Sequence, residues 1–249
     1  DRMIIDGLDL DVHAGEVLGV VGGSGTGKSV LTRCILGLVP KRRGKIYAFG
    51  QDLDEATGPN HRAVERRWGV LFQHGALFSS LTVKQNIQVP LREYLSLSEP
   101  LMDEIARLKI AMAGLRPDAA DKYPSELSGG MIKRAALARA IVMDPELLFF
   151  DEPSAGLDPV VSAELDELIL RLRDALRMTI VVVTHELESA FRIADRITVL
   201  DQGDILTTGT VAEVRASENE RIQDLLNRRP RAVEVDVDDY LRRLTEEDA

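Results

Sequence analysis

The chain is poor in cysteine, in long apolar runs and in basic residues, and each shortage disfavours a class of protein. Its 249 residues include one cysteine, Cys34, so no disulfide can form within the chain and a reducing, cytosolic setting is favoured. The longest apolar runs, such as residues 147–150 and 180–183, are far shorter than the ~20 residues of a membrane-spanning helix. We therefore expect any membrane role of this sequence to be peripheral.

Acidic residues outnumber basic ones, with 41 Asp and Glu against 31 Lys and Arg and a formal net charge of −10. Because a protein that neutralises a phosphate backbone needs the opposite balance, a nucleic-acid partner is disfavoured. Half of this net charge lies at residues 234–249, which hold seven acids and two arginines. We expect residues 230–249 to form a separate C-terminal extension. Its alternating apolar residues favour docking on a partner over a disordered, solubilising end.

Short apolar runs alternate with helix-length amphipathic stretches over most of the chain. Strands are predicted at residues 17–21, 46–49, 68–72, 147–150, 180–183 and 197–200. Helices are predicted at residues 30–38, 160–176 and 187–194, and a helical insert at residues 91–142. Strands that alternate with helices of this length indicate right-handed crossovers and a parallel sheet, so the predicted fold class is α/β.

A glycine-rich segment between the first predicted strand and helix matches the pattern G-x-x-x-x-G-K-[ST]. It consists of Gly22, Gly23, Ser24, Gly25, Thr26, Gly27, Lys28 and Ser29. In this strand–loop–helix context the backbone N–H groups converge on a phosphate, and the positive end of the helix dipole favours its charge. We expect Lys28 to contact the β- and γ-phosphates of a nucleotide and Ser29 to bind Mg²⁺.

Two adjacent acids, Asp151 and Glu152, follow the apolar run at residues 147–150. A buried strand delivers Asp151 to the carboxyl edge of the sheet, where open α/β sheets bind their ligands. We expect Asp151 to hold Mg²⁺ through water. Because neighbouring strand residues face opposite ways, Glu152 is free to act as general base on an attacking water.

Residues Leu127-Ser128-Gly129-Gly130-Met131, with the helix predicted after them, resemble the signature of the ATPase subunits of ATP-binding-cassette (ABC) transporters. The other elements of that family stand in order along the chain. Gln73 resembles the Q-loop glutamine, residues 154–159 with Asp158 resemble the D-loop, and His185 resembles the switch histidine. The resemblance covers residues 1 to about 215.

This resemblance implies a P-loop NTPase (RecA-like) core with a parallel sheet, a small antiparallel β subdomain and a helical subdomain at about residues 75–145. The whole ATPase domain would span residues 1–229. The cofactors implied are ATP and Mg²⁺, with Ser29, Gln73 and Asp151 as the metal-binding residues.

The resemblance also implies a head-to-tail homodimer that holds two ATP molecules. Each ATP would lie between one subunit's glycine loop and the other's Ser128, Gly129 and Gly130, with Asp158 contributing to nucleotide binding. Residues implied in hydrolysis are Lys28, Gln73, Glu152 and His185.

Within the family, residues 71–78, residues 89–93 and the LSGGM form of the signature most resemble the branch that transports phospholipid between bacterial envelope membranes. This likeness implies an integral membrane permease, a small cytoplasmic accessory subunit and a periplasmic lipid-binding protein as partners. It also implies a peripheral position on the cytoplasmic face of the inner membrane. The alternatives are the ATPase of a small-solute importer, for example of amino acids, and a soluble cassette ATPase that acts on ribosomes or DNA.

Three features depart from the family pattern. Met131 replaces the glutamine usual elsewhere in the family, and Gly23 stands where proline is common. Residues 1–21 contain no aromatic side chain, although the family places its adenine-stacking aromatic before the glycine loop. The sequence therefore leaves the group that would contact adenine unassigned.

Overall fold

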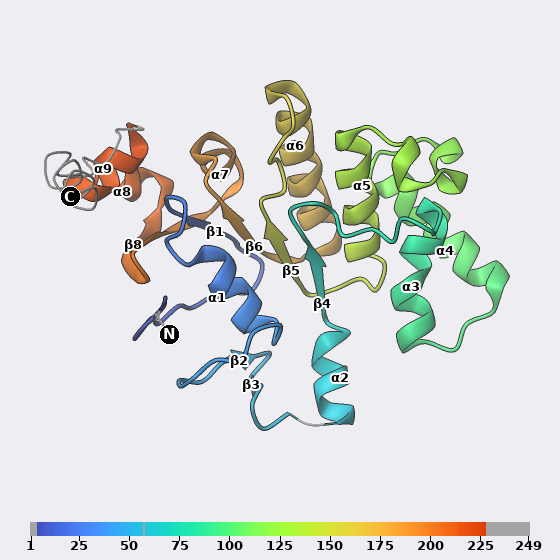
Figure 1. Ribbon diagram of the computed structural model, residues 1–249, viewed down its shortest axis with the longest axis horizontal. Coiled ribbons are helices and arrows are strands. Elements are labelled where there is room, and N and C mark those ends of the chain that lie inside the picture. The colour runs from blue at the N-terminus through green and yellow to red at the C-terminus, as the bar shows by residue number, and fades with distance from the viewer. Residues whose placement is uncertain (1–3, 57, 228–249) are drawn as a thin grey trace, which may run out of the picture.

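A six-stranded sheet forms the centre of the chain (Figure 1). The computed structural model describes residues 4–56 and 58–227, so the predicted extension at residues 230–249 lies outside the described part. The spatial order of the strands is β4-β5-β6-β1-β7-β8, and the neighbours from β4 to β7 pair in parallel. The strands are β1 (Val17–Val21), β4 (Trp68–Leu71), β5 (Leu147–Asp151), β6 (Thr179–Thr184), β7 (Arg196–Asp201) and β8 (Asp204–Thr210). The predicted α/β class is confirmed.

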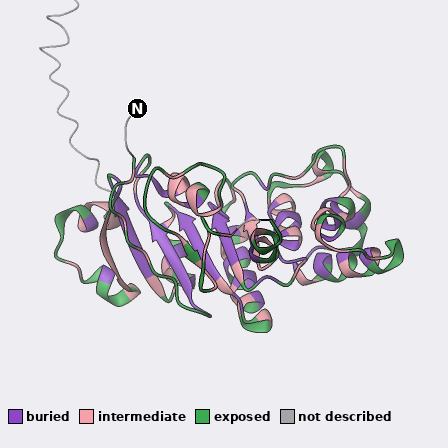
Figure 2. Cartoon of the chain, turned by 90° about the horizontal axis from the view of Figure 1, so that it is seen from below, coloured by how far each residue is buried: buried purple, intermediate pink, exposed green. Residues whose placement is uncertain are grey.

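Helices cover both faces of this sheet, because alternate residues of its strands are buried on opposite sides. On one face, Leu18 and Val20 of β1 pack with Leu31 and Ile35. On the other face, Val17 belongs to a cluster that includes residues of three further helices. The helices concerned are α1 (Lys28–Ile35) on the first face and α5 (Gly129–Ala140), α6 (Pro159–Leu176) and α7 (Leu187–Ile193) on the second. Figure 2 shows the resulting buried strands in purple.

The helical insert has an apolar core of its own, beside the β4 edge of the sheet (Figure 1). Its elements are α3 (Val83–Tyr94), α4 (Glu99–Met112), the 3₁₀ turns η1 (Pro117–Asp121) and η2 (Pro124–Glu126), and α5. Buried residues of α3, α4 and α5, such as Ile87, Ile110 and Ala135, form one cluster. The separate cluster supports a helical subdomain, while its proposed limits at about 75 and 145 stay a prediction.

The small antiparallel sheet is also present, as the pair β2 (Tyr47–Ala48) and β3 (Gln51–Asp52). Phe49 and Gly50 form its two-residue turn with φ of 52° and 76°, the left-handed values that such a hairpin needs. The predicted strand at residues 46–49 is therefore too long by one residue at each end. A short helix, α2 (Pro59–Glu65), follows this hairpin.

Strand β8 and the two helices after it were not predicted from the sequence. Residues 205–209 of β8 are all half-buried and include two threonines and a glycine, so the strand lacks the apolar run that marks a core strand. It pairs antiparallel with β7 across a turn at Gln202 and Gly203, where φ is 50° and 89°. Helices α8 (Val211–Arg215) and α9 (Glu220–Leu226) complete the described chain.

Two predicted helix ends also need correction. The helix predicted at residues 30–38 begins at Lys28, inside the glycine motif, and ends at Ile35 because Gly37 turns the chain with φ of 69°.

Within residues 4–56 and 58–227, no helix combines the length and the apolar character needed to cross a membrane.

Candidate active site

The glycine-rich loop joins the buried end of β1 to the first turn of α1. Gly27 is the N-cap of α1 with φ of 104°, a conformation that side-chain-bearing residues rarely adopt. Gly22 has a different requirement, since a Cβ atom there would lie 2.2 Å from the carbonyl oxygen of Leu200 in β7. The loop thus passes too close to the neighbouring strand for any side chain at Gly22, and its N–H groups open onto the N-terminus of α1.

Lys28 lies within this loop and is 7% exposed. Its Nζ donates hydrogen bonds of 2.8 Å to the carbonyl oxygens of Gly22 and Gly23. Burial lowers the pKa of Lys28, while the charges of Glu152 and Asp151 act in the opposite direction. The ammonium group is therefore held at the loop, where a phosphate would meet it. Ser29 follows as the second residue of α1 and is half-buried.

Asp151 ends β5 and is 8% exposed. Its Oδ1 atom is buried without a hydrogen-bond partner. Burial raises the pKa of Asp151, and so does the charge of Glu152, while Arg33, Lys133 and Lys28 lower it. A carboxylate oxygen without a protein partner is a suitable ligand for a hard cation such as Mg²⁺, directly or through water.

Glu152 and His185 form the best-defined side-chain pair of the site, with Oε1 and Nδ1 2.8 Å apart. The other carboxylate oxygen of Glu152, Oε2, accepts a hydrogen bond of 3.1 Å from the hydroxyl of Thr184. Glu152 is 8% exposed, whereas the side chain of His185 is 56% exposed. The carboxylate is thus oriented by β6 and the residue after it, with one edge of the imidazole free to meet a ligand.

Gln73 begins the turn at residues 73–76, two residues after the end of β4, and it is exposed. Its carbonyl oxygen accepts a hydrogen bond from Nζ of Lys133 in α5. Lys133 also donates to the carbonyl oxygen of Glu152, at 2.9 Å. The same lysine thereby connects the two predicted residues, although sequence analysis did not single it out.

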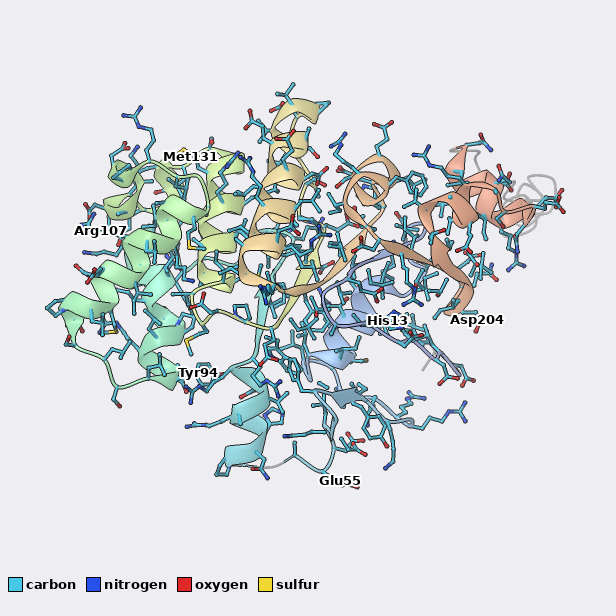
Figure 3. The ribbon with its side chains drawn as sticks, turned by 180° about the vertical axis from the view of Figure 1, so that it is seen from behind. His13, Glu55, Tyr94, Arg107, Met131 and Asp204 are labelled. Carbon is cyan, nitrogen blue, oxygen red and sulfur yellow. The ribbon has the colours of Figure 1, made fainter. Side chains whose placement is uncertain are left out.

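The signature residues Ser128, Gly129 and Gly130 lie at the N-terminus of α5, not beside the glycine loop in the sequence. Ser128 is the N-cap of α5 and accepts a hydrogen bond from the N–H of Met131. Figure 3 shows Met131 in the helical part of the chain. A Cβ atom at Gly130 would lie 2.9 Å from the side chain of Val161 in α6, and Gly129 faces Leu157. Ser128 and Gly129 are exposed, so this surface is open to a partner.

Asp158 is the N-cap of α6 and accepts hydrogen bonds of 3.1 Å from the N–H groups of Val160 and Val161. Its carboxylate is thus engaged within its own helix, although the residue is exposed. A role of Asp158 in nucleotide binding stays a prediction.

A cleft of about 810 Å³ brings further predicted residues onto one surface. Gly23 and Ser24 of the glycine loop line it together with His185 and Leu157. Near Gly27 of the same loop, a Cβ atom would lie 3.2 Å from the side chain of Ile5 and 3.3 Å from that of Ile4. Aliphatic side chains therefore pack closely against the loop at Gly27.

The sequence profile of the ABC transporter family matches residues 5–155, more than half of the chain. This chain belongs to the ABC transporter family. Among curated relatives of this ABC ATPase is the intermembrane phospholipid transport system ATP-binding protein MlaF of Haemophilus influenzae. The two are 38% identical over 249 residues, which cover 99% of this chain and 94% of the relative. MlaF of Escherichia coli strain K12 is 38% identical over 227 residues, or 91% of this chain and 84% of the relative.

Another relative is the probable ribonucleotide transport ATP-binding protein mkl of Mycobacterium leprae. It is 38% identical over 226 residues, which cover 91% of this chain and 65% of the relative. The family and these relatives identify the chain as a transporter ATPase, as the sequence predicted.

Solved ABC cassettes have the same fold. A dimeric ATP-binding cassette in a post-hydrolysis state, bound to ADP and Pi, superposes with a TM-score of 0.77 at 27% identity, covering 84% of this chain and 90% of that one. CbiO1 of Clostridium perfringens, part of the ABC transporter complex CbiONQ, gives a TM-score of 0.77 at 29% identity, covering 92% of this chain and 90% of that one. The predicted P-loop NTPase fold is confirmed.

Proposed function

We propose that this ABC ATPase drives the transport of phospholipid between the membranes of a bacterial envelope. The observation that carries the hydrolytic part is the arrangement of Glu152, hydrogen-bonded to His185, next to the unpartnered Oδ1 of Asp151. The phospholipid part is supported by the likeness to MlaF over nearly the full length of both chains.

The glycine loop would bind the phosphates of ATP. Backbone N–H groups at the start of α1 supply donors, and Lys28 supplies a positive charge that is already held at the loop. When phosphate oxygens arrive, Nζ can exchange the carbonyl oxygens of Gly22 and Gly23 for charged acceptors, which form stronger hydrogen bonds. Binding would therefore require little rearrangement of the loop.

Asp151, Ser29 and Gln73 would hold Mg²⁺ beside the phosphates. The buried and unpartnered Oδ1 of Asp151 fits this cation, since Mg²⁺ in phosphate-transfer sites is held by one or two carboxylates together with phosphate and water. When bound, the metal ion neutralises charge on the phosphate oxygens. Gln73 is exposed at the end of β4 and is free to turn toward the ion.

Glu152 would act as general base on the attacking water. Thr184 and His185 hold its carboxylate from two sides, which limits the orientations it can adopt. The exposed edge of His185 would contact the γ-phosphate and so place water, base and phosphate in line. Positioning and charge stabilisation would thus supply most of the catalysis.

The working unit would be a head-to-tail homodimer on the cytoplasmic face of the inner membrane. Within each subunit the exposed Ser128 and Gly129 would complete the partner's nucleotide site, and Asp158 would lie near that interface. An integral membrane permease would receive the motion of dimer closure. A small cytoplasmic accessory subunit and a periplasmic lipid-binding protein would be further partners.

A small-solute transporter is the second candidate, because mkl, named as a probable ribonucleotide transport protein, is as similar in sequence as MlaF. The test is mass spectrometry of the complex purified from membranes with this chain as bait. A permease with retained phospholipid is the expected result. The ATPase rate of the purified complex is then measured with ribonucleotides and with phospholipid vesicles. A rate that responds to ribonucleotides and not to phospholipid vesicles would support the second candidate and overturn the first.

A further inference from the structure

Two cations of α5 hold the chain segment that begins at Gln73. Lys133 donates to the carbonyl oxygen of Gln73. Further along the same helix, Arg139 donates hydrogen bonds to the carbonyl oxygens of Gly75, at 2.8 Å, and Ala76, at 2.7 Å. Three of the four carbonyl groups between residues 73 and 76 thus accept hydrogen bonds from α5, so this segment is tied to the helix.

Lys133 has a second role that Arg139 does not share. Its Nζ reaches the carbonyl oxygen of Glu152 at 2.9 Å, although its side chain comes from the helical part of the chain. Lys133 is 5% exposed, and burial lowers its pKa, while the charges of Glu152, Asp151 and Glu186 oppose that effect. A buried ammonium group is unfavourable unless its donors are satisfied. The two backbone carbonyl groups therefore define where this ammonium lies.

The backbone of Glu152 depends on such contacts because it is left-handed, with φ of 51°. This conformation is unfavourable for a residue other than glycine, so neighbouring groups must hold it in place. The N–H of Glu152 donates to the carbonyl oxygen of Val183 at 2.8 Å, and its own carbonyl accepts from Lys133 and from the N–H of Ala155 at 3.3 Å. These contacts fix the direction in which the carboxylate leaves the backbone.

We propose that Lys133 is a positioning residue that couples the signature helix α5 to the hydrolytic carboxylate of Glu152 through the backbone at Gln73 and Glu152. The inference rests on the proposed function of Glu152. Because the signature residue Ser128 caps the N-terminus of α5, a displacement of the signature moves this helix and the ammonium group of Lys133 with it. In a head-to-tail dimer the signature faces the partner's nucleotide. Lys133 would thus make hydrolysis in one site depend on ATP bound in the other.

The test compares K133M with a matched control, K109M, in the 249-residue chain and in the transporter complex. Lys109 is equally buried, at 4% exposure, and pairs with Asp144 within the helical part, away from Gln73 and Glu152. Both substitutions remove a buried ammonium group and keep a flexible apolar side chain. We expect K133M to lower kcat of ATP hydrolysis by about tenfold or more, with the ATP dissociation constant changed less than about twofold.

Hydrogen exchange supplies a readout that does not depend on activity. We expect faster amide exchange at residues 73–76 and 152–155 in K133M and unchanged exchange there in K109M. K133R keeps a charged donor and should recover part of the lost kcat. If K133M does not fold, K133Q retains a single donor group and should show the same loss of kcat at unchanged ATP affinity.

The possible results separate this inference from the proposed function. A wild-type complex without ATPase activity would overturn the proposed function before any variant is compared. An active wild type with an unchanged kcat in the Lys133 variants would overturn the inference alone. Equal losses of kcat in K133M and K109M, or a loss confined to thermal stability, would show that Lys133 contributes only to folding and would also overturn it.

Discussion

Glu152 is held by His185 on its side chain and by Lys133 on its backbone. Oε1 lies 2.8 Å from Nδ1 of His185, and the carbonyl oxygen lies 2.9 Å from Nζ of Lys133. The two contacts come from different parts of the fold, the residue directly after β6 and helix α5, and meet at one residue. Because each contact restricts a different set of torsion angles, the carboxylate is confined to one orientation without a ligand.

The first prediction is that E152Q keeps ATP binding and stops turnover. An amide has the size of the carboxylate and can contact His185, but it cannot accept a proton from water. We expect kcat to fall by about 100-fold or more, as for loss of a general base, with an unchanged ATP dissociation constant.

Size-exclusion chromatography of E152Q with ATP and Mg²⁺ should show a dimer that persists, because hydrolysis no longer reopens it. Measurement of steady-state rates provides the second check. Hydrolysis at the wild-type rate would remove Glu152 from the role of base and leave the nucleotide-binding assignment intact.

The second prediction concerns Lys28, whose ammonium group is held between two carbonyl oxygens of the glycine loop. K28A removes the charge that would face the β- and γ-phosphates. Since a hydrogen bond to a charged group contributes about 1.5–3 kcal/mol, we expect the ATP dissociation constant to rise by about 10- to 150-fold.

K122A is the matched control, since Lys122 is paired with Asp118 in the helical part and is not part of the loop. Isothermal titration calorimetry with ATP and Mg²⁺ measures both variants. Unchanged ATP affinity in K28A would contradict the assignment of the glycine loop.

Sequence motifs singled out some residues of this candidate site and not the residues that hold them in place. Lys28, Asp151 and Glu152 were singled out because a motif or a buried strand fixes their place along the chain, and their roles stay predictions. Lys133 and Thr184 were missed. Their contacts with Glu152 depend on how α5 and β6 lie against β5, and no spacing in the sequence records that packing.

The same distinction applies to the fold. Strand β1 was predicted at its observed limits, because all five of its residues are buried and apolar. Strand β8 escaped prediction because it is an edge strand with half-buried threonines. Its turn at Gln202 and Gly203 was the available signal, since glycine after a polar residue is typical of a two-residue hairpin.

The third prediction concerns the close approach of Gly22 to β7. A Cβ atom at Gly22 would lie 2.2 Å from the carbonyl oxygen of Leu200, so G22A must displace the backbone of β7 or of the loop. We expect a loss of about 1–3 kcal/mol in the free energy of unfolding, measured by urea denaturation.

G23A is the matched control in the same loop. A Cβ atom at Gly23 would meet only the side chain of Thr26, at an ordinary contact distance of 3.8 Å. We expect its free energy of unfolding to stay within about 0.5 kcal/mol of the wild type. Equal losses in both variants would show that general loop stiffness, and not contact with Leu200, determines the effect.

The last prediction is that Asp151 lowers the stability of the nucleotide-free chain at neutral pH. Burial raises its pKa above the ordinary value of 3.8, so the folded chain holds this proton more tightly than the unfolded chain. Ionisation is thus harder in the folded state, and stability falls as the pH rises through the window between 3.8 and the folded pKa. D151N removes this penalty. Without nucleotide at pH 7, we expect a gain of about 1 kcal/mol, or a Tm higher by roughly 2–4 °C.

The gain should shrink as the pH is lowered toward 3.8, because the wild-type carboxyl group then becomes neutral like the amide. Addition of ATP and Mg²⁺ should reverse the order at pH 7, since the wild type gains a metal-mediated contact that the amide cannot provide. Thermal melts of both chains at several pH values, with and without ATP and Mg²⁺, measure each effect. A D151N chain that is less stable than the wild type without nucleotide would show that Asp151 stabilises the fold, and that its unpartnered oxygen is not reserved for a cation.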